Sequence, residues 1–291
     1  RADDTMSKAI SRILRADLSP SGEHLLVALA ARRSEETEGA EGAEGAAEES
    51  DFQGAERGKQ DSMPVFVTDS GYVEVKKIRP KVGTGAAESP TLLLLDLVRQ
   101  TQVALDLTVL PGIADDPLAE LRAAATLATL PTPAKAVAPD PAPRPVHLAE
   151  VRWNEHGSRV ALQFFSADNK DRWLAIVSSS ASEASVPAVE SLVHESDPAW
   201  LGWRFTDFGW MKDDRELWFL SESSGFSHLY VQSPGGTKRA LTQGPFEVDQ
   251  PRLARDGRSF FVSANRESAG NYEAYRVRLD SQGLEPLTAA G

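Results

Sequence analysis

Short apolar stretches separated by polar turns recur along the second half of this chain, with a repeat of about 40 residues. In 210–242, a charged turn precedes a short apolar strand. A loop of small residues follows, then a second strand that ends on an aromatic residue, another turn and a closing Leu-Thr. The stretch 251–288 repeats this order. Repeats of this length built only from short strands indicate the blades of a β-propeller.

Two more divergent copies lie upstream. One occupies 151–177, and another begins at 18–28 and continues, after a long insertion, with the apolar strand 91–97. The pattern therefore predicts an all-β fold. We expect a β-propeller of about four four-stranded blades that form a partial ring, with one short helix and long loop insertions.

The turn that opens each copy carries glycine at Gly22, Gly157 and Gly257, and glycine readily takes the positive φ that hairpin turns often need. In the copy 210–242 this turn reads Asp213-Asp214-Arg215 and has no glycine. Arg215 breaks the rule, so we expect a turn of a different type there.

Two segments have the composition of connections within a propeller domain that spans 1–291. The range 31–62 is a low-complexity acidic insertion in which Glu, Gly and Ala repeat. It cannot bury enough apolar area to order itself, so we interpret it as a solvated loop, the alternative being an acidic tether for a basic partner. The range 131–147 is rich in proline and is predicted to be an extended linker between blades.

Two further local patterns predict secondary structure between these segments. Alternation of apolar and polar residues over 72–78 predicts a half-buried strand. Asp116 and Pro117 precede an apolar-periodic stretch and suit the N-cap and first position of a short helix on the propeller rim.

Charge and composition exclude several classes of function. The 291 residues carry a net charge of -12, which argues against nucleic acid and anionic membrane surfaces as partners. No apolar stretch is long enough for a transmembrane helix or a signal peptide, and the N-terminus reads as if cut from a longer chain. Cysteine is absent, which excludes disulfides and thiolate chemistry.

Motifs for catalysis are also missing from the sequence. No G-x-S-x-G nucleophile elbow occurs, and none of the five histidines has the spacing of a helical metal site. We therefore expect no catalytic residue, no metal site and no cofactor in this chain.

Aromatic residues concentrate in 200–210, together with an arginine. Trp203, Arg204 and Phe205 are the candidate substrate-binding residues, because aromatic side chains next to an arginine are typical of recognition surfaces. The alternative is that these aromatic residues pack between blades.

Several short runs, in the same order along the chain, resemble a known family. They are Trp200-Leu-Gly-Trp-Arg-Phe205, Phe219-Leu-Ser-Glu222, Gly225-Phe-Ser-His-Leu-Tyr230 and Leu241-Thr-Gln-Gly-Pro-Phe-Glu-Val248. Upstream, Arg79-Pro-Lys-Val-Gly83 and the strand after it fit as well. The sequence resembles the propeller region of the prolyl oligopeptidase family of serine peptidases, in its dipeptidyl peptidase IV branch.

The resemblance implies an N-terminal propeller that gates and shapes the peptide-substrate pocket of a C-terminal α/β-hydrolase domain. In the family that domain carries the catalytic Ser, Asp and His, and it is absent from this chain. A homodimer and a periplasmic or secreted location are further implications. The family's amine-binding Glu-Glu pair has no counterpart in 7–14, which puts strict dipeptidyl specificity in doubt. The alternative function is a non-catalytic, protein-binding propeller scaffold.

Overall fold

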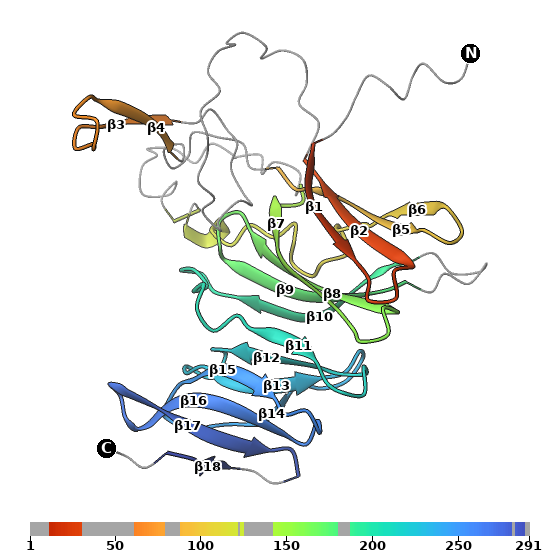
Figure 1. Cartoon of the computed structure of the whole chain (residues 1–291), viewed down its shortest axis with the longest axis vertical. Coiled ribbons are helices and arrows are strands. Elements are labelled where there is room, and N and C mark those ends of the chain that lie inside the picture. Colours follow the sequence, from red (N-terminus) through yellow and green to blue (C-terminus); the bar gives the residue numbers. More distant parts are fainter. Residues whose placement is uncertain are drawn as a thin grey trace.

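The computed structural model describes residues 12–30, 61–78, 88–121, 123–124, 142–179, 187–280 and 283–288. These residues form four four-stranded antiparallel sheets and one two-stranded hairpin, with very little helix (Figure 1). The predicted all-β propeller architecture is confirmed, including its four four-stranded blades. The strands in chain order are β1 (Ile13–Leu18), β2 (His24–Leu29), β3 (Asp61–Val65), β4 (Glu74–Ile78), β5 (Thr91–Asp96), β6 (Thr101–Ala104), β7 (Val146–Trp153), β8 (Arg159–Ser166), β9 (Asp171–Ser178), β10 (Val189–Ser196), β11 (Phe208–Trp210), β12 (Leu217–Ser221), β13 (His228–Gln232), β14 (Arg239–Ala240), β15 (Val248–Leu253), β16 (Ser259–Ser268), β17 (Asn271–Arg278) and β18 (Leu284–Pro286).

Each blade is a simple antiparallel meander. Blade 1 has the order β1-β2-β5-β6, blade 2 β7-β8-β9-β10, blade 3 β11-β12-β13-β14 and blade 4 β15-β16-β17-β18. In blade 1, β2 pairs with β5 from His24 opposite Asp96 to Leu29 opposite Thr91. The pairing across the long insertion is therefore as the apolar pattern predicts.

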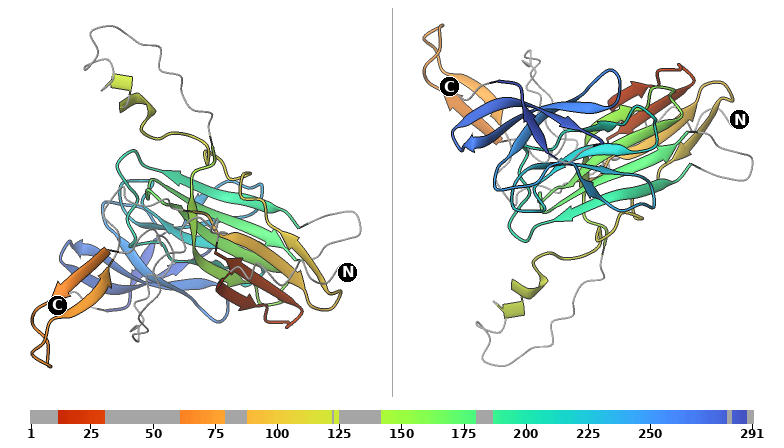
Figure 2. Two further views of the ribbon diagram at one scale, coloured as in Figure 1. Left: turned by 90° about the horizontal axis from the view of Figure 1, so that it is seen from above. Right: turned by 90° about the horizontal axis from the view of Figure 1, so that it is seen from below.

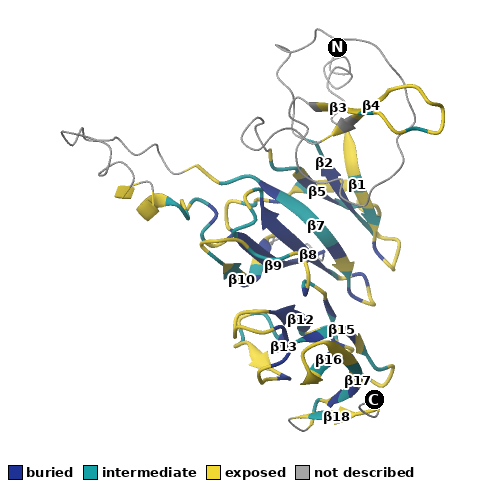
Figure 3. Cartoon of the chain, turned by 90° about the vertical axis from the view of Figure 1, so that its left-hand side faces the viewer, coloured by how far each residue is buried: buried dark blue, intermediate teal, exposed yellow. Residues whose placement is uncertain are grey.

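Apolar side chains fill the spaces between neighbouring blades. Strand residues alternate between the two faces of a sheet, so Val160 and Leu162 of β8 face blade 1 while Ala161 faces blade 3. Blades 3 and 4 enclose a third cluster that includes Leu220 and Phe260. The inner strands of blade 2 are buried on both faces, as Figure 3 shows.

The first and last blades lie at opposite ends of the stack, so the described residues form an open arc rather than a closed ring (Figure 1). Their outward faces carry exposed apolar side chains, which include Ile13 and Leu18 in blade 1 and Phe261 in blade 4. The propeller is thus a partial ring, in agreement with the sequence. No helix among the described residues is long and apolar enough to cross a membrane.

The opening turns of all four blades have the same geometry. Gly22, Gly157 and Gly257 have φ of 73°, 69° and 68°, and in blade 3 Asp214 takes this position with a φ of 57°. In each turn the amide of this residue donates to the carbonyl three residues earlier. The expectation of a different turn type around Arg215 is therefore wrong, because the left-handed position is Asp214, and aspartate tolerates that conformation.

These turns also contact one another from blade to blade. The carboxylate of Asp214 in blade 3 lies 2.5 Å from Nδ1 of His156 in blade 2. Lys212 Nζ donates to Glu155 across the same boundary, at 2.8 Å. The turns therefore form a continuous row along one face of the arc.

The hairpin of β3 and β4 projects away from the blades in both views of Figure 2. Its apolar side chains, among them Phe66, Tyr72 and Val75, are exposed. The prediction of a half-buried strand over 72–78 is thus wrong in its burial, because none of the other sheets that the structure describes covers the hairpin.

Residues 119–121 and 123–124 are helical, in line with the short helix that the sequence predicts. The Asp116 carboxylate accepts a hydrogen bond from the amide of Leu118 at 3.0 Å, as an N-cap does. Most of the acidic insertion 31–62 and of the proline-rich range 131–147 lies outside the described residues, and β7 begins within the latter, at Val146.

Candidate functional site

Connections at one end of the blades bring together the residues that the sequence singles out. In an antiparallel meander successive connections alternate between the two ends of the sheet. The β8–β9 turn, the β12–β13 turn, the β16–β17 turn and the connection from β10 to β11 therefore share one end, opposite the row of opening turns. The aromatic segment 197–207 is the connection from β10 to β11, so it lies on this face.

The β8–β9 turn holds this segment in place. Asn169, at a φ of 55°, accepts hydrogen bonds from the Leu201 amide through its carbonyl and from Trp203 Nε1 through its side chain, at 2.7 and 3.1 Å. Lys170 Nζ donates to the carbonyl of Ala199 at 2.6 Å. The indole of Trp203 remains 48% exposed, so it is positioned and still accessible from solvent.

Arg204 reaches from this segment across to blade 4. Its guanidinium forms a 3.0 Å ion pair with Asp249, which raises the pKa of Arg204. The same group lies over the rings of Phe205 and Tyr272, 4.5 and 5.4 Å from their centroids. Tyr272 in turn donates to Glu247 at 2.8 Å. The exposed guanidinium of Arg204 therefore links the segment before blade 3 to blade 4, through its ion pair with Asp249 and its contact with the Tyr272 ring.

Phe205 differs from its two neighbours. It is only 9% exposed and belongs to the apolar cluster between blades 3 and 4, with a φ of 60°. Of the three residues that the sequence proposes, Trp203 and Arg204 present their side chains to solvent, and Phe205 anchors the segment.

A buried arginine that sequence reasoning missed supports the end of the segment. Arg172 is 3% exposed, and its guanidinium donates to Glu195, to Gln163 and to the carbonyls of Thr206 and Leu220 at 2.8–3.2 Å. Burial lowers the pKa of Arg172, and the Glu195 carboxylate opposes this effect. The arginine ties blade 2 to the residues just before β11 and within β12. A charged residue directly before the apolar run 173–177, at a position that the strand then buries, is the sequence signal that could have revealed it.

Around Glu222, three carboxylates stand against two guanidinium groups. Burial and the nearby carboxylates of Glu247 and Glu195 raise the pKa of Glu222, while Arg172 and Arg204 partly offset them. The local field is therefore negative, which favours cationic and disfavours anionic ligands. No group of three His, Asp or Glu side chains within the described ranges is arranged to hold a metal ion.

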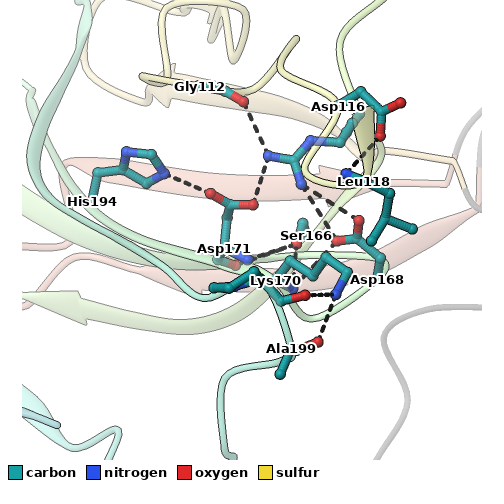
Figure 4. Close-up of polar contacts among 11 residues, drawn as sticks. Gly112, Asp116, Leu118, Ser166, Asp168, Lys170, Asp171, His194 and Ala199 are labelled. Carbon is teal, nitrogen blue, oxygen red and sulfur yellow. Dashed lines mark hydrogen bonds and ion pairs between the residues drawn. The ribbon is translucent and has the colours of Figure 1, made fainter. Parts of the chain in front are cut away.

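A second polar cluster fixes the opposite side of the β8–β9 turn (Figure 4). The carboxylate of Asp171, the first residue of β9, lies 2.7 Å from His194 Nε2 and 2.6 Å from the guanidinium of Arg144. Arg144 also donates to the carbonyl of Gly112, and the Trp173 indole stacks on the His194 ring at 5.3 Å. This cluster docks the connection between blades 1 and 2 on blade 2, so the turn that holds Trp203 is braced from both sides.

A cavity of about 200 Å³ opens beside Trp203, between blades 2 and 3. Its lining residues are His147, Ala149, Glu150, Arg152, Gln163, Phe165, Trp203, Thr206, Asp207 and Phe208. The His147 ring stacks on Phe165 with the centroids 5.5 Å apart, and burial lowers the pKa of His147. The wall of the cavity at this point is therefore a neutral pair of rings.

Comparison with known proteins gives a consistent result. The family described as the dipeptidyl peptidase IV (DPP IV) N-terminal region matches residues 121–291. Over 92 residues, the chain is 35% identical to the "Uncharacterized peptidase YuxL" of Bacillus subtilis (strain 168). The aligned stretch covers 30% of this chain and 14% of that protein.

The crystal structure of dipeptidyl peptidase 4 from Porphyromonas gingivalis has a similar fold. The TM-score is 0.56 at 14% identity, over 94% of this chain and 30% of that one. At this identity the similarity concerns the fold alone. This chain spans less than a third of the length of either relative.

Proposed function

Because this chain belongs to the dipeptidyl peptidase IV N-terminal region family, we propose that it forms part of the propeller domain of a serine exopeptidase. In this proposal, the propeller gates and shapes a peptide-binding pocket that a C-terminal α/β-hydrolase domain completes. That domain supplies the nucleophile, the base and the acid residue. This chain supplies binding surface and the exclusion of water.

The observation that carries the proposal is the fixed position of the segment 197–207 on the end of the blades. Asn169 and Lys170 hold its first half, Arg172 holds its end, and Phe205 is inserted into the core. Preorganised aromatic and cationic side chains bind a ligand without first losing conformational freedom. Trp203 and Arg204 are thus suited to contact a peptide backbone or side chain.

The chemistry of Arg204 suggests its role. Its guanidinium already pairs with Asp249 and still has 59% of its side chain exposed, so further donors remain available to an incoming carbonyl oxygen. The carboxylates around it disfavour a free substrate carboxylate nearby. A peptide amide or a free amino group suits the field of this face better.

Kinetics of Arg204→Ala in the full-length protein test the proposal. We expect kcat/KM for peptide substrates to fall about tenfold, which corresponds to about 1.4 kcal/mol of transition-state binding. The melting temperature should change little, because an exposed ion pair contributes about 0–1 kcal/mol to stability. Arg255→Ala is the matched control, since Arg255 lies in the blade 4 opening turn at the other end of the sheets.

Two results would contradict the proposal. A collapse of the melting temperature with normal kinetics in the remaining folded enzyme would make Arg204 structural. Absence of any peptidase activity in the full-length protein would favour a protein-binding scaffold.

A further inference from the structure

The cavity beside Trp203 has a layered lining. Its deep residues are Phe165, Phe208 and Gln163, each 4% exposed. Its rim carries exposed Trp203 and, from the strands and connection around it, charged side chains of both signs. A ligand group that enters therefore passes a polar rim and reaches an aromatic interior.

The size of the cavity suits one side chain. Pockets for small molecules usually enclose roughly 300–1,000 Å³, and this one encloses about 200 Å³. The rim combines Arg152 with the carboxylates of Glu150 and Asp207, and Glu150 also pairs with Arg15 at 3.2 Å, so the negative field of this face is weaker at the cavity. The rings of His147, Phe165 and Phe208 favour a planar apolar group.

Gln163 adds one polar requirement. Its Oε1 accepts a hydrogen bond from Arg172 at 3.1 Å, and an arginine only donates. This contact fixes the orientation of the amide, so Nε2 is the atom left over. Among the described residues Nε2 has no hydrogen-bond acceptor, although the side chain is almost fully buried and lines the cavity. Solvent still reaches Nε2 through the cavity. A phenyl ring that displaced this solvent would leave the donor without an acceptor, which is costly, whereas a ligand oxygen would accept its hydrogen bond.

We propose that this cavity is a subsite for the side chain of a tyrosine in a bound peptide. The phenol ring stacks among His147, Phe165 and Phe208, and its oxygen accepts a hydrogen bond from Gln163 Nε2. The Trp203 indole contacts the phenol ring at the rim of the cavity. The assignment rests on the proposed function, because it names a substrate residue for the same face of the propeller.

Binding of three small probes to the purified chain tests the subsite. They are N-acetyl-tyrosinamide, N-acetyl-phenylalaninamide and N-acetyl-lysinamide, titrated by calorimetry or by NMR of the tryptophan indoles. We expect the tyrosine probe to bind about three- to tenfold more tightly than the phenylalanine probe, the usual effect of one neutral hydrogen bond. The lysine probe should bind more weakly than both. Equal affinity for all three probes, or no binding of the tyrosine probe, would overturn the assignment.

Variants separate the aromatic walls from the amide. Trp203→Ala should weaken both aromatic probes, whereas Tyr72→Ala should change neither, because Tyr72 is exposed in the β3–β4 hairpin and does not line the cavity. Gln163→Met should abolish the preference for tyrosine over phenylalanine while both still bind. An unchanged preference in Gln163→Met would overturn the role of the amide.

Gln163→Met also removes an acceptor of Arg172 and can therefore destabilise the fold. A second variant that keeps Gln163 tests the location of the subsite independently. Ala149→Phe adds a ring at the cavity lining and should block both aromatic probes, and retained binding in this variant would overturn the location. These readouts need no catalysis. If the unsubstituted protein shows no preference for the tyrosine probe while Arg204→Ala still lowers kcat/KM, the subsite is refuted and the proposed function stands. If the tyrosine preference is present but Arg204→Ala leaves kcat/KM unchanged, the subsite stands and the proposed role of Arg204 is refuted.

Discussion

Alanine substitutions at equivalent glycines can measure how much the row of opening turns stabilises the propeller. Gly22, Gly157 and Gly257 have φ values of 73°, 69° and 68°. Alanine in this left-handed conformation costs about 1–2 kcal/mol. The strain is therefore nearly the same at all three positions, and any further difference between the variants reports on what surrounds them.

The surroundings differ sharply. A Cβ at Gly22 meets no atom within 4 Å, whereas at Gly157 it comes within 2.8 Å of Ser21 Oγ and 3.1 Å of Ser19 Cβ, in the turn of the preceding blade. At Gly257 it comes within 2.7 Å of Lys212 Cβ, again in the preceding blade. Overpacking of this kind costs about 1–3 kcal/mol. We expect Gly22→Ala to lose about 1–2 kcal/mol, and the other two variants to lose about 2–5 kcal/mol each.

Urea unfolding of the purified chain, followed by tryptophan fluorescence and circular dichroism, gives the free energies. Gly235→Ala is a second control, because Gly235 has a φ of 66° in another turn and its Cβ would meet nothing within 4 Å. It should resemble Gly22→Ala. Equal destabilisation by all four substitutions would refute the reasoning, since the packing of one turn on the next would then contribute nothing.

Three further predictions concern the buried polar groups and the missing nucleophile. Arg172→Met should lower the free energy of unfolding by about 3–5 kcal/mol, because it leaves the Glu195 carboxylate without its buried partner, and a loss below about 1 kcal/mol in denaturant titrations would contradict this. Burial lowers the pKa of His228 below its ordinary value of 6.5, so its contribution to stability is complete above pH 6.5 and declines as the pH falls through the folded pKa. Melting curves at pH 7.5, 6.5 and 5.5 should show this decline in the wild type and less of it in His228→Gln. A fluorophosphonate probe should label no serine of this chain stoichiometrically, since no nucleophile elbow is present, and mass spectrometry of the treated protein would reveal any exception.

The strands and their pairing were predictable because their information is local. Short apolar runs between polar turns locate β8, β9, β12 and β16, and the same pattern pairs β2 with β5 across the insertion. The geometry of the turn around Arg215 was not predictable. Asp214 has a left-handed φ of 57°, and the sequence does not distinguish such an aspartate from any other charged turn residue.

The candidate site was only partly predictable for a related reason. The cluster of aromatic residues with Arg204 is visible in the sequence, and the exposure of Trp203 fits a binding role. The burial of Phe205 and the contacts of Arg172 depend on residues in three different blades, which become neighbours only when the arc assembles. No local pattern encodes that assembly.

The separate apolar clusters between successive blades have a consequence for cooperativity. Each cluster couples only two adjacent sheets, so the stability of the arc resembles that of a linear array with nearest-neighbour terms. Amide hydrogen exchange should then be slowest in β8 and β9, which have a neighbour on each side, and faster in β1 and β17, whose sheets have one. The protein would open from its ends inward. The segment 197–207 belongs to the boundary between two inner sheets, so it would keep its shape while the outer sheets exchange.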